Sequence, residues 1–192
     1  SYQSVSGAGQ PGIHELDEQW TKGAGQSDRF LVAGREQLEP GTVWDRPIAG
    51  NVIPLAGSIR AGGLTSEEWK LIHESRKILH APDLAVSVTC VRVPVYVGHA
   101  MTANVRFRRP LPPEEATALL ADAPGVRLVD GGAGHPTPLE SAGIDPVLVG
   151  RVREDPSEPG GLDIWVTGDN LRKGAALNAV QIAELLVGGQ SA

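Results

Sequence analysis

The sequence is poor in cysteine, in aromatic residues and in long apolar runs, and basic residues are not in excess. Its one cysteine, Cys90, allows no internal disulfide and favours a reducing compartment, so we expect a cytoplasmic protein. No apolar run has the length of a transmembrane helix, and no signal peptide is recognisable. The formal net charge of −6 argues against nucleic acids or a membrane surface as main partners. Aromatic residues make up only 4%, so Val, Leu, Ile and Ala must supply most of the core.

The rest of the composition is typical of one globular domain. The chain has 192 residues, of which 41% are hydrophobic and 21% charged, enough to enclose a real core. The chain begins at Ser1 without an initiator Met, and residues 2–5 resemble the later part of a strand whose beginning is missing. We therefore expect either a processed product or, more in keeping with the pattern, a segment of a longer protein.

Helical patterns are predicted at four places. Residues 10–22 carry Ile13, Leu16 and Trp20 at helical spacing. The clearest helix, residues 65–79, has a capping-box sequence at Thr65 and Glu68. Its apolar face would comprise Trp69, Leu71, Ile72, Ile78 and Leu79. Residues 113–121 form a shorter helix, and residues 173–187 form a closing helix that is apolar nearly all round. We expect such a helix to be buried against a partner, or against a part of the protein that lies outside this chain.

Strands are predicted where β-branched residues alternate with others. These are residues 84–96, 102–108, 126–129, 147–152 and 162–167. The first two are joined through Gly98, which suggests antiparallel neighbours, whereas residues 23–57 and 131–143 look irregular. Helices and strands do not follow a βαβ rhythm. The pattern favours an α+β fold with a largely antiparallel mixed sheet and helices on one face.

The stretch T-C-V-R-V-P-V-Y-V-G-H, residues 89–99, carries two polar groups that could do chemistry. Arg92 lies within an apolar run, and His99 follows Gly98 just beyond it. A guanidinium and an imidazole from one strand could bind an anion and move a proton beside it. The alternative is a half-buried strand with its Arg on the wet face and its His in a turn. Cys90 sits in mid-strand, where a small core residue is the simpler interpretation.

Other candidate residues are scattered along the chain. The five histidines show no metal-ligand spacing with Cys or carboxylates, so a metal site is not expected. Residues 1–9 are predicted to be a strand end that runs into a glycine-rich loop, whose small residues are weak support for phosphate binding because no P-loop lysine accompanies them. Glu67 and Lys70 are three residues apart on the predicted helix; they form either a solvent-facing ion pair or part of a site. Gln3, Glu67, Lys70, Arg92 and His99 together suit a small zwitterionic molecule with several anionic groups.

Several separated motifs resemble one known family. They are S-Y-Q-S-V-S-G-A-G, P-I-A-G-N-V-I-P, E-E-W-K followed by E-S-R-K-I-L, C-V-R with a histidine seven residues after the Arg, V-G-R-V-R, and G-D-N-L-R-K-G-A-A-L-N. With them the chain resembles, over essentially its whole length, the C-terminal substrate-binding and dimerisation domain of aspartate-semialdehyde dehydrogenase, most closely the actinobacterial type. The resemblance implies a fold like the C-terminal domain of glyceraldehyde-3-phosphate dehydrogenase. It also implies a substrate-binding domain at 1–170 and a helix at 171–192 that packs on an N-terminal Rossmann domain.

The resemblance also implies roles for individual residues. Gln3 would orient the substrate beside a nucleophilic cysteine, Glu67 would receive its amino group, and Lys70 would meet phosphate. Arg92 would hold the α-carboxylate, and His99 would act as general acid and base. Ser6, Gly7 and Asn170 would lie at the nicotinamide end of NADP.

The reaction implied is reduction of L-4-aspartyl phosphate by NADPH to L-aspartate 4-semialdehyde, on the route to lysine, threonine, methionine and diaminopimelate, by a homodimer associated through the sheet. The family's nucleophilic cysteine and Rossmann domain match nothing in this chain, and Cys90 matches a strand position. Residues 1–192 alone are therefore expected to be inactive and to bind NADP weakly or not at all.

Two alternatives stay open. One is a non-catalytic dimerisation or interaction module, including a paralogue that lacks the cysteine. The other is an enzyme like N-acetyl-γ-glutamyl-phosphate reductase. The acylated amino group of that enzyme's substrate would give Glu67 no ammonium to receive.

Overall fold

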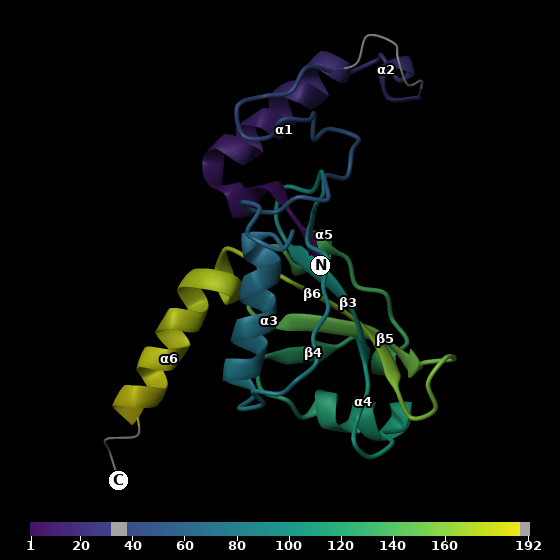
Figure 1. Cartoon of the computed structure of the whole chain (residues 1–192). Helices are drawn as coiled ribbons and strands as arrows, with labels where there is room; N and C mark the ends of the chain where they lie inside the picture. Colours follow the sequence, from purple (N-terminus) through teal and green to yellow (C-terminus); the bar gives the residue numbers. More distant parts are fainter. Residues whose placement is uncertain (32–37, 189–192) are drawn as a thin grey trace. The chain divides into compact units, whose positions relative to one another are not determined.

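The computed structural model describes residues 1–31 and 38–188. The chain divides into two compact units, Ser1–Tyr96 and Val97–Ala192. Figure 1 labels the α-helices of both units and the strands of the second. This division was not predicted from the sequence. The predicted boundary at residue 170 concerns the closing segment and stays a prediction.

The first unit is mainly helical and contains one short pair of strands. Its elements are β1 (Tyr2–Gln3), the 3₁₀ helix η1 (Val5–Ala8), α1 (Gly9–Gly23), α2 (Asp28–Leu31), α3 (Ser66–Ile78) and β2 (Val91–Arg92). β1 and β2 run parallel, with Tyr2 opposite Val91 and Gln3 opposite Arg92. This pairing joins the start of the unit to its end.

The core of the first unit lies between α1 and the irregular segment 38–53. The core cluster consists of Val5, Leu16, Leu38, Ile48, Ala49 and Ile53. Two buried polar side chains of α1 hold the irregular segment in place. The Gln19 Oε1 accepts hydrogen bonds from the backbone N–H groups of Ile48 and Ala49, at 2.8 and 3.0 Å. The Glu15 Oε2 accepts one from the Val43 N–H at 2.7 Å. Backbone groups without strand partners are thus satisfied by side chains.

Two predictions for this unit are wrong. Segment 1–9 is not a glycine-rich loop, because residues 5–8 form η1. The predicted strand 84–96 is a strand only at Val91–Arg92. Pro94 has no N–H to donate to a sheet, and the Val95 N–H turns back to the Val93 carbonyl at 2.8 Å. Alternating valines therefore follow an irregular path here.

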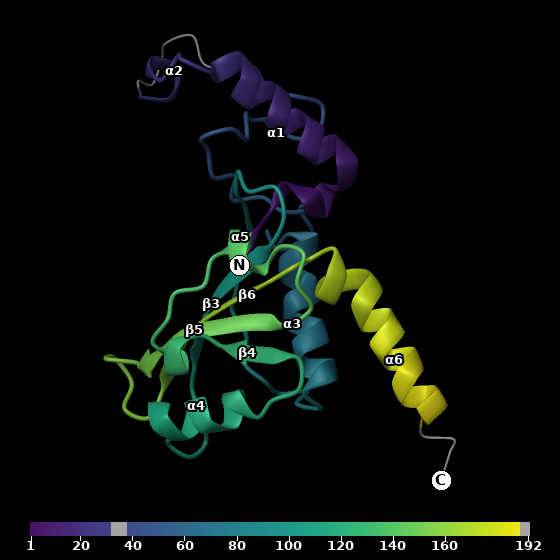
Figure 2. The same cartoon turned by 180° about the vertical axis from the view of Figure 1, so that it is seen from behind.

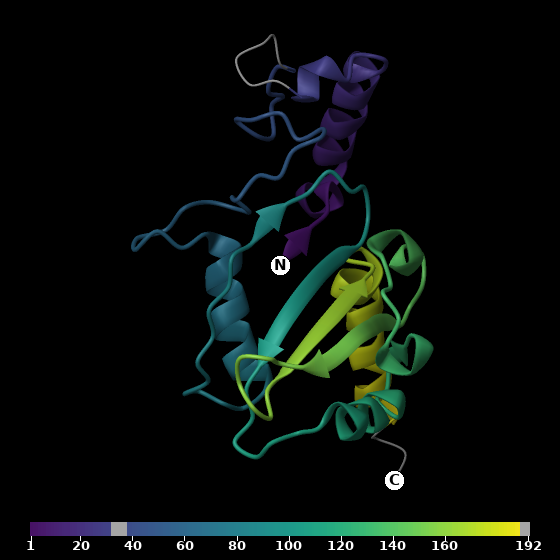
Figure 3. The same cartoon turned by 90° about the vertical axis from the view of Figure 1, so that its right-hand side faces the viewer.

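The second unit is built on four strands. Its elements are β3 (His99–Val105), α4 (Pro113–Ala121), β4 (Val126–Leu128), the 3₁₀ helix η2 (Asp130–Gly132), α5 (Pro138–Ser141), β5 (Val147–Glu154), β6 (Leu162–Gly168), the π-helix η3 (Arg172–Ala176) and α6 (Leu177–Gly188). The strand order is β3-β6-β5-β4, and Figure 3 shows β3, β6 and β5 side by side. β6 is antiparallel to both of its neighbours, whereas β4 and β5 are parallel.

The sheet of the second unit corrects two further predictions. The strand predicted at 102–108 begins at His99 and ends at Val105, and it pairs with β6, not with the segment before Gly98. His99 is therefore the first residue of a strand and not part of a turn. The loop predicted at 131–143 contains α5 and part of η2. Buried Ala100, Ala116, Leu148, Val149 and Leu162 form the apolar interior of the unit, where α4 contacts β4 and β5.

The closing helix, predicted at 173–187, is present as η3 and α6, and α6 buries none of its side chains. Exposed apolar residues of α6 include Val180, Ile182, Leu185, Leu186 and Val187, and Figure 2 shows the helix projecting away from the strands of its unit. No helix in the described part of the chain is long and apolar enough to cross a membrane.

Candidate substrate-binding site

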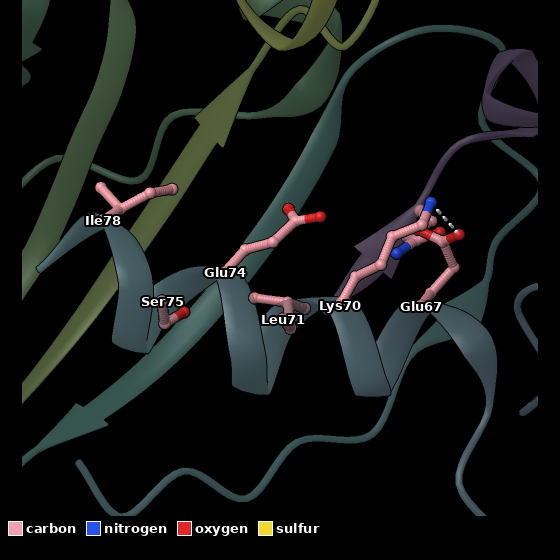
Figure 4. A pocket seen from close by; sticks show the side chains of 7 residues that line it. Glu67, Lys70, Leu71, Glu74, Ser75 and Ile78 are labelled. Atoms are coloured by element: carbon pink, nitrogen blue, oxygen red, sulfur yellow. Dashed lines mark hydrogen bonds and ion pairs between the residues drawn. The ribbon is translucent and has the colours of Figure 1, made fainter. Parts of the chain in front are cut away.

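A pocket of about 350 Å³ lies beside α3 in the first unit. Its lining comprises Gln3 of β1 and six residues of α3: Glu67, Lys70, Leu71, Glu74, Ser75 and Ile78. Figure 4 shows the α3 side chains ranged along one side of the helix. Three residues predicted from the sequence, Gln3, Glu67 and Lys70, therefore border one cavity.

Glu67 and Lys70 form an ion pair in the lining of this pocket. The Lys70 Nζ donates to the Glu67 Oε1 at 2.7 Å (Figure 4), and the two side chains are 50% and 29% exposed, respectively. The predicted capping box explains their position. The Thr65 Oγ1 accepts from the Glu68 N–H, the Thr65 N–H donates to Glu68, and α3 begins at Ser66. An exposed pair of this kind contributes little to stability, so a zwitterionic ligand could separate it at low cost.

Arg92 is a charged group buried in the first unit. Its side chain is 5% exposed, its Nη1 donates to the Ser4 carbonyl at 2.8 Å, and its buried Nε has no hydrogen-bond partner. No ion pair among the described residues includes it. Burial lowers the pKa of Arg92, and the negative charge of Glu67 opposes this shift. A buried cation that lacks a carboxylate partner is costly and is suited to binding an anion.

The backbone of β2 fixes the position of this guanidinium. The Arg92 N–H donates to the Ile53 carbonyl at 2.8 Å, and its carbonyl accepts from the Ile53 N–H at 3.0 Å. On the other side, the Val93 N–H donates to the Gln3 carbonyl at 3.0 Å, next to the Gln3–Arg92 register pair. Gln3 is itself 6% exposed. Gln3 and Arg92 are thus held side by side on paired strands.

Cys90 has the properties of a packing residue. It has no exposed surface, and burial raises the pKa of its thiol, an effect that the positive charge of the N-terminus opposes. A nucleophilic cysteine needs thiolate character and access. These surroundings provide neither.

His99 and Asn170 lie in the second unit. His99 is half-buried at the start of β3, and its carbonyl accepts from the Thr167 Oγ1 at 3.0 Å. The Gly98 N–H donates to the Asn170 Oδ1 at 2.9 Å. Gly98 has a φ of +96°, and a Cβ there would come within 2.6 Å of the Pro138 carbonyl oxygen. This turn, which requires glycine, brings Asn170 to the residue before His99.

Ser6 and Gly7, predicted to contact the cofactor, lie in η1. The Ser6 N–H donates to the Tyr96 carbonyl at 3.1 Å, and the Gly7 N–H donates to the Ser4 carbonyl at 3.1 Å. Both amide donors are therefore already used. Gly7 is exposed, and its carbonyl could accept a hydrogen bond from an amide group such as a carboxamide.

The sequence-based interpretation missed part of the pocket wall. Leu71, Glu74, Ser75 and Ile78 were not assigned to the site, although they follow Glu67 and Lys70 at helical spacing. That spacing was the available signal. The described part of the chain contains no group of three or more His, Cys, Asp or Glu residues that could hold a metal ion.

Comparison with known proteins assigns the family. Residues 1–173 match the family model described as semialdehyde dehydrogenase, dimerisation domain. The chain belongs to this family. It is 54% identical over 190 residues to an aspartate-semialdehyde dehydrogenase of Streptomyces akiyoshiensis, and the match covers 97% of the chain and 55% of that enzyme. The corresponding enzyme of Mycolicibacterium smegmatis is 50% identical, over 97% of the chain and 54% of the enzyme.

Solved structures agree with the sequence comparison. The crystal structure of aspartate semialdehyde dehydrogenase II from Vibrio cholerae superposes with a TM-score of 0.86 at 44% identity, covering 97% of the chain and 52% of that structure. A second structure of the same enzyme is complexed with ASA and has a TM-score of 0.85. The chain thus spans about half the length of the relatives that it matches. The resemblance found in the sequence and the predicted α+β fold class are both confirmed.

Proposed function

We propose that this chain supplies the substrate-binding and dimerisation half of an NADP-dependent aspartate-semialdehyde dehydrogenase. Such an enzyme reduces L-4-aspartyl phosphate to L-aspartate 4-semialdehyde in the cytoplasm, in the biosynthesis of lysine, threonine, methionine and diaminopimelate. The observation that carries the proposal is the buried Arg92, whose Nε has no partner and whose charge is unpaired among the described residues. A ligand carboxylate would provide both the charge and the acceptor that this group lacks.

The substrate has one charged group for each of Arg92, Glu67 and Lys70. Its α-carboxylate would bind Arg92, its ammonium would bind Glu67, and its phosphate would bind Lys70. The relative from Vibrio cholerae that was solved in complex with ASA supports binding of a ligand of this class. Gln3, buried beside Arg92 on the neighbouring strand, would orient the acyl group. Placing the reactant in one geometry is the entropic part of catalysis.

His99 would carry the proton in both chemical steps. In the first step, a cysteine thiolate from the other half of the enzyme attacks the acyl carbon, a C–S bond forms, and the C–O bond to phosphate breaks. His99 would take the proton from that thiol before the attack. NADPH, when bound, would supply the hydride that reduces the thioester. His99 would then return the proton to the departing sulfur.

The cofactor contacts of this half would be few. Ser6 and Gly7 have already used their amide N–H groups, so the Gly7 carbonyl would accept from the carboxamide of the nicotinamide. Asn170, whose Oδ1 accepts from the Gly98 N–H, would hold the turn before His99 and lie near the nicotinamide. NADP binding by residues 1–192 alone is therefore expected to be weak.

We also propose a homodimer that associates through the sheet, in keeping with the family's description as a dimerisation domain. Residues 1–170 would form the substrate-binding domain. Residues 171–192 would pack on the nucleotide-binding half of the enzyme. The exposed apolar side chains of α6 support this packing.

A chimera tests the proposal. The part of the Streptomyces enzyme that precedes its match to this chain is joined to residues 1–192. NADPH formation is then followed by absorbance with L-aspartate 4-semialdehyde, phosphate and NADP, the reverse reaction. We expect phosphate-dependent activity that His99→Ala cripples and that His135→Ala, an exposed histidine of the same unit, leaves unchanged. We expect Arg92→Lys to raise KM by roughly ten- to a hundredfold, since a point charge cannot replace the planar fork.

Other outcomes would count against this function. A folded, dimeric chimera without phosphate-dependent activity would contradict it. Activity with N-acetyl-glutamate semialdehyde in preference to aspartate semialdehyde would favour the related reductase. An Arg92→Lys variant with an unaltered KM would show that Arg92 is structural.

A further inference from the structure

Glu68 has a role that a helix cap alone does not explain. In a capping box the glutamate returns one hydrogen bond to the first residue of the box, and Glu68 does so: its Oε2 accepts from the Thr65 N–H at 2.8 Å. Its other oxygen, Oε1, accepts from the Cys90 N–H at 2.9 Å, across 22 residues. The side chain is 7% exposed. One carboxylate thus joins the start of α3 to the chain two residues before Arg92.

The second contact fills a gap in the hydrogen bonding of β2. The N–H groups of Val91 and Val93 donate to β1 side carbonyls, those of Ser1 and Gln3. On the opposite edge, the Arg92 N–H donates to Ile53, and none of the strands in the described residues accepts from Cys90. Glu68 takes the place of that missing strand. Every N–H from Cys90 to Val93 is therefore satisfied.

This connection links the two elements that carry the proposed ligand contacts. α3 carries Glu67 and Lys70, and β2 carries Arg92. The two hydrogen bonds also lower the pKa of Glu68, so the carboxylate is ionised at neutral pH and acts as an acceptor only. A glutamine could satisfy one of the two N–H groups, but its amide nitrogen would oppose the other.

We infer that Glu68 is a positioning residue that sets the separation between the charged pair Glu67–Lys70 and the Arg92 guanidinium. The inference rests on the proposed function. A ligand that spans both elements would depend on Glu68. A ligand that contacts α3 alone would not. A cap with a purely structural role would not make this distinction.

The test uses two probes and the 192-residue chain. The full probe is L-2-amino-4-oxo-5-phosphonopentanoate, in which a methylene replaces the anhydride oxygen of aspartyl phosphate; it is called the ketophosphonate here. The second probe lacks its α-carboxylate. Calorimetry should show that Glu68→Gln weakens binding of the ketophosphonate roughly tenfold, because a misplaced contact is costly. The probe without the carboxylate should bind as it does to the wild type.

Thr65→Ala is the matched control. It removes the Oγ1 that caps α3 at the Glu68 N–H and that also hydrogen-bonds the Glu68 carboxylate, but it leaves the two backbone hydrogen bonds of that carboxylate, from Thr65 and Cys90. It should lower stability while keeping the wild-type ratio of the two affinities. Equal weakening of both probes by Glu68→Gln, or no weakening of either, would overturn the positioning role. If the wild type binds neither probe, the proposed function fails instead.

A measurement on the wild type keeps the inference testable should Glu68→Gln fail to fold. The ketophosphonate spans both elements and should slow hydrogen exchange of the Cys90 amide by roughly fivefold or more. The probe without the carboxylate should leave that rate unchanged. The same rate with both probes would contradict the inference.

Discussion

Replacing Arg92 with methionine should make the chain more stable while removing its affinity for carboxylates. The guanidinium is buried, with an unpartnered Nε and no ion pair among the described residues. Methionine fills a similar apolar volume and needs no hydrogen bonds. Replacing buried ionic groups with apolar ones is often neutral or stabilising, by as much as about 4 kcal/mol.

The structure sets the opposing contributions. Loss of the hydrogen bond from Nη1 to the Ser4 carbonyl costs about 1.5–3 kcal/mol, but that carbonyl still accepts from the Gly7 N–H. Removing the unpartnered Nε should stabilise the fold by about 1–3 kcal/mol, and removing the buried charge adds to this gain. We therefore expect Arg92→Met to raise the free energy of unfolding by about 1–2 kcal/mol.

Urea denaturation at neutral pH, followed by circular dichroism and tryptophan fluorescence, measures this difference. Arg92→Lys is the control, since it keeps a buried charge and should show no gain. A loss of about 2 kcal/mol or more in Arg92→Met would refute the reasoning. It would show that Arg92 stabilises the fold through its hydrogen bond to Ser4, and not that it is a ligand-binding residue whose burial lowers stability.

Two further predictions concern the second unit. The Asp155 carboxylate accepts from Asn104 and Ser157, and these bonds lower its pKa to about 2. The ionised Asp155 carboxylate therefore stabilises the fold above a pH of about 4, the pKa of an unfolded aspartate, and this stabilisation is lost as the pH falls toward 2. The urea midpoints of the wild type and Asp155→Asn should converge between those two pH values. A constant difference between the midpoints would contradict this. Gly98→Ala should lower the free energy of unfolding by about 1–3 kcal/mol more than Gly63→Ala does. Both glycines have a positive φ, but of the two only Gly98 would bring a Cβ against a backbone atom, the Pro138 carbonyl oxygen. Equal urea midpoints for the two variants would show that Pro138 moves to accommodate the Cβ.

The sequence predicted local structure better than long-range pairing. The capping box at Thr65 and Glu68 depends on residues three apart, and α3 begins where it predicts. The second hydrogen bond of Glu68, to Cys90, had no counterpart in any local pattern. The same limit applies to β2. Its partner is β1, nearly ninety residues earlier, whereas the alternating valines suggested a long strand paired across Gly98.

The candidate site was predicted in parts. Gln3, Glu67 and Lys70 were grouped by their chemistry and given individual roles through family motifs, and the structure places them around one pocket. The burial of Arg92 could not be predicted, because it depends on Ile53 and Ser4, which no periodicity connects to it. Gln19 and Glu15, which hold the irregular segment, were also missed, since a polar residue on a helix is ordinarily assigned to the surface. The roles of His99 and Asn170 stay predictions.

The most direct test of the account compares the affinities of the two probes for the wild type and for Arg92→Met. If Arg92 binds the α-carboxylate, removing that carboxylate from the ketophosphonate should weaken binding to the wild type by roughly ten- to a hundredfold. Arg92→Met should bind both probes with the same weakened affinity. An equal loss in the two proteins would show that the carboxylate binds elsewhere and would contradict the assignment of Arg92.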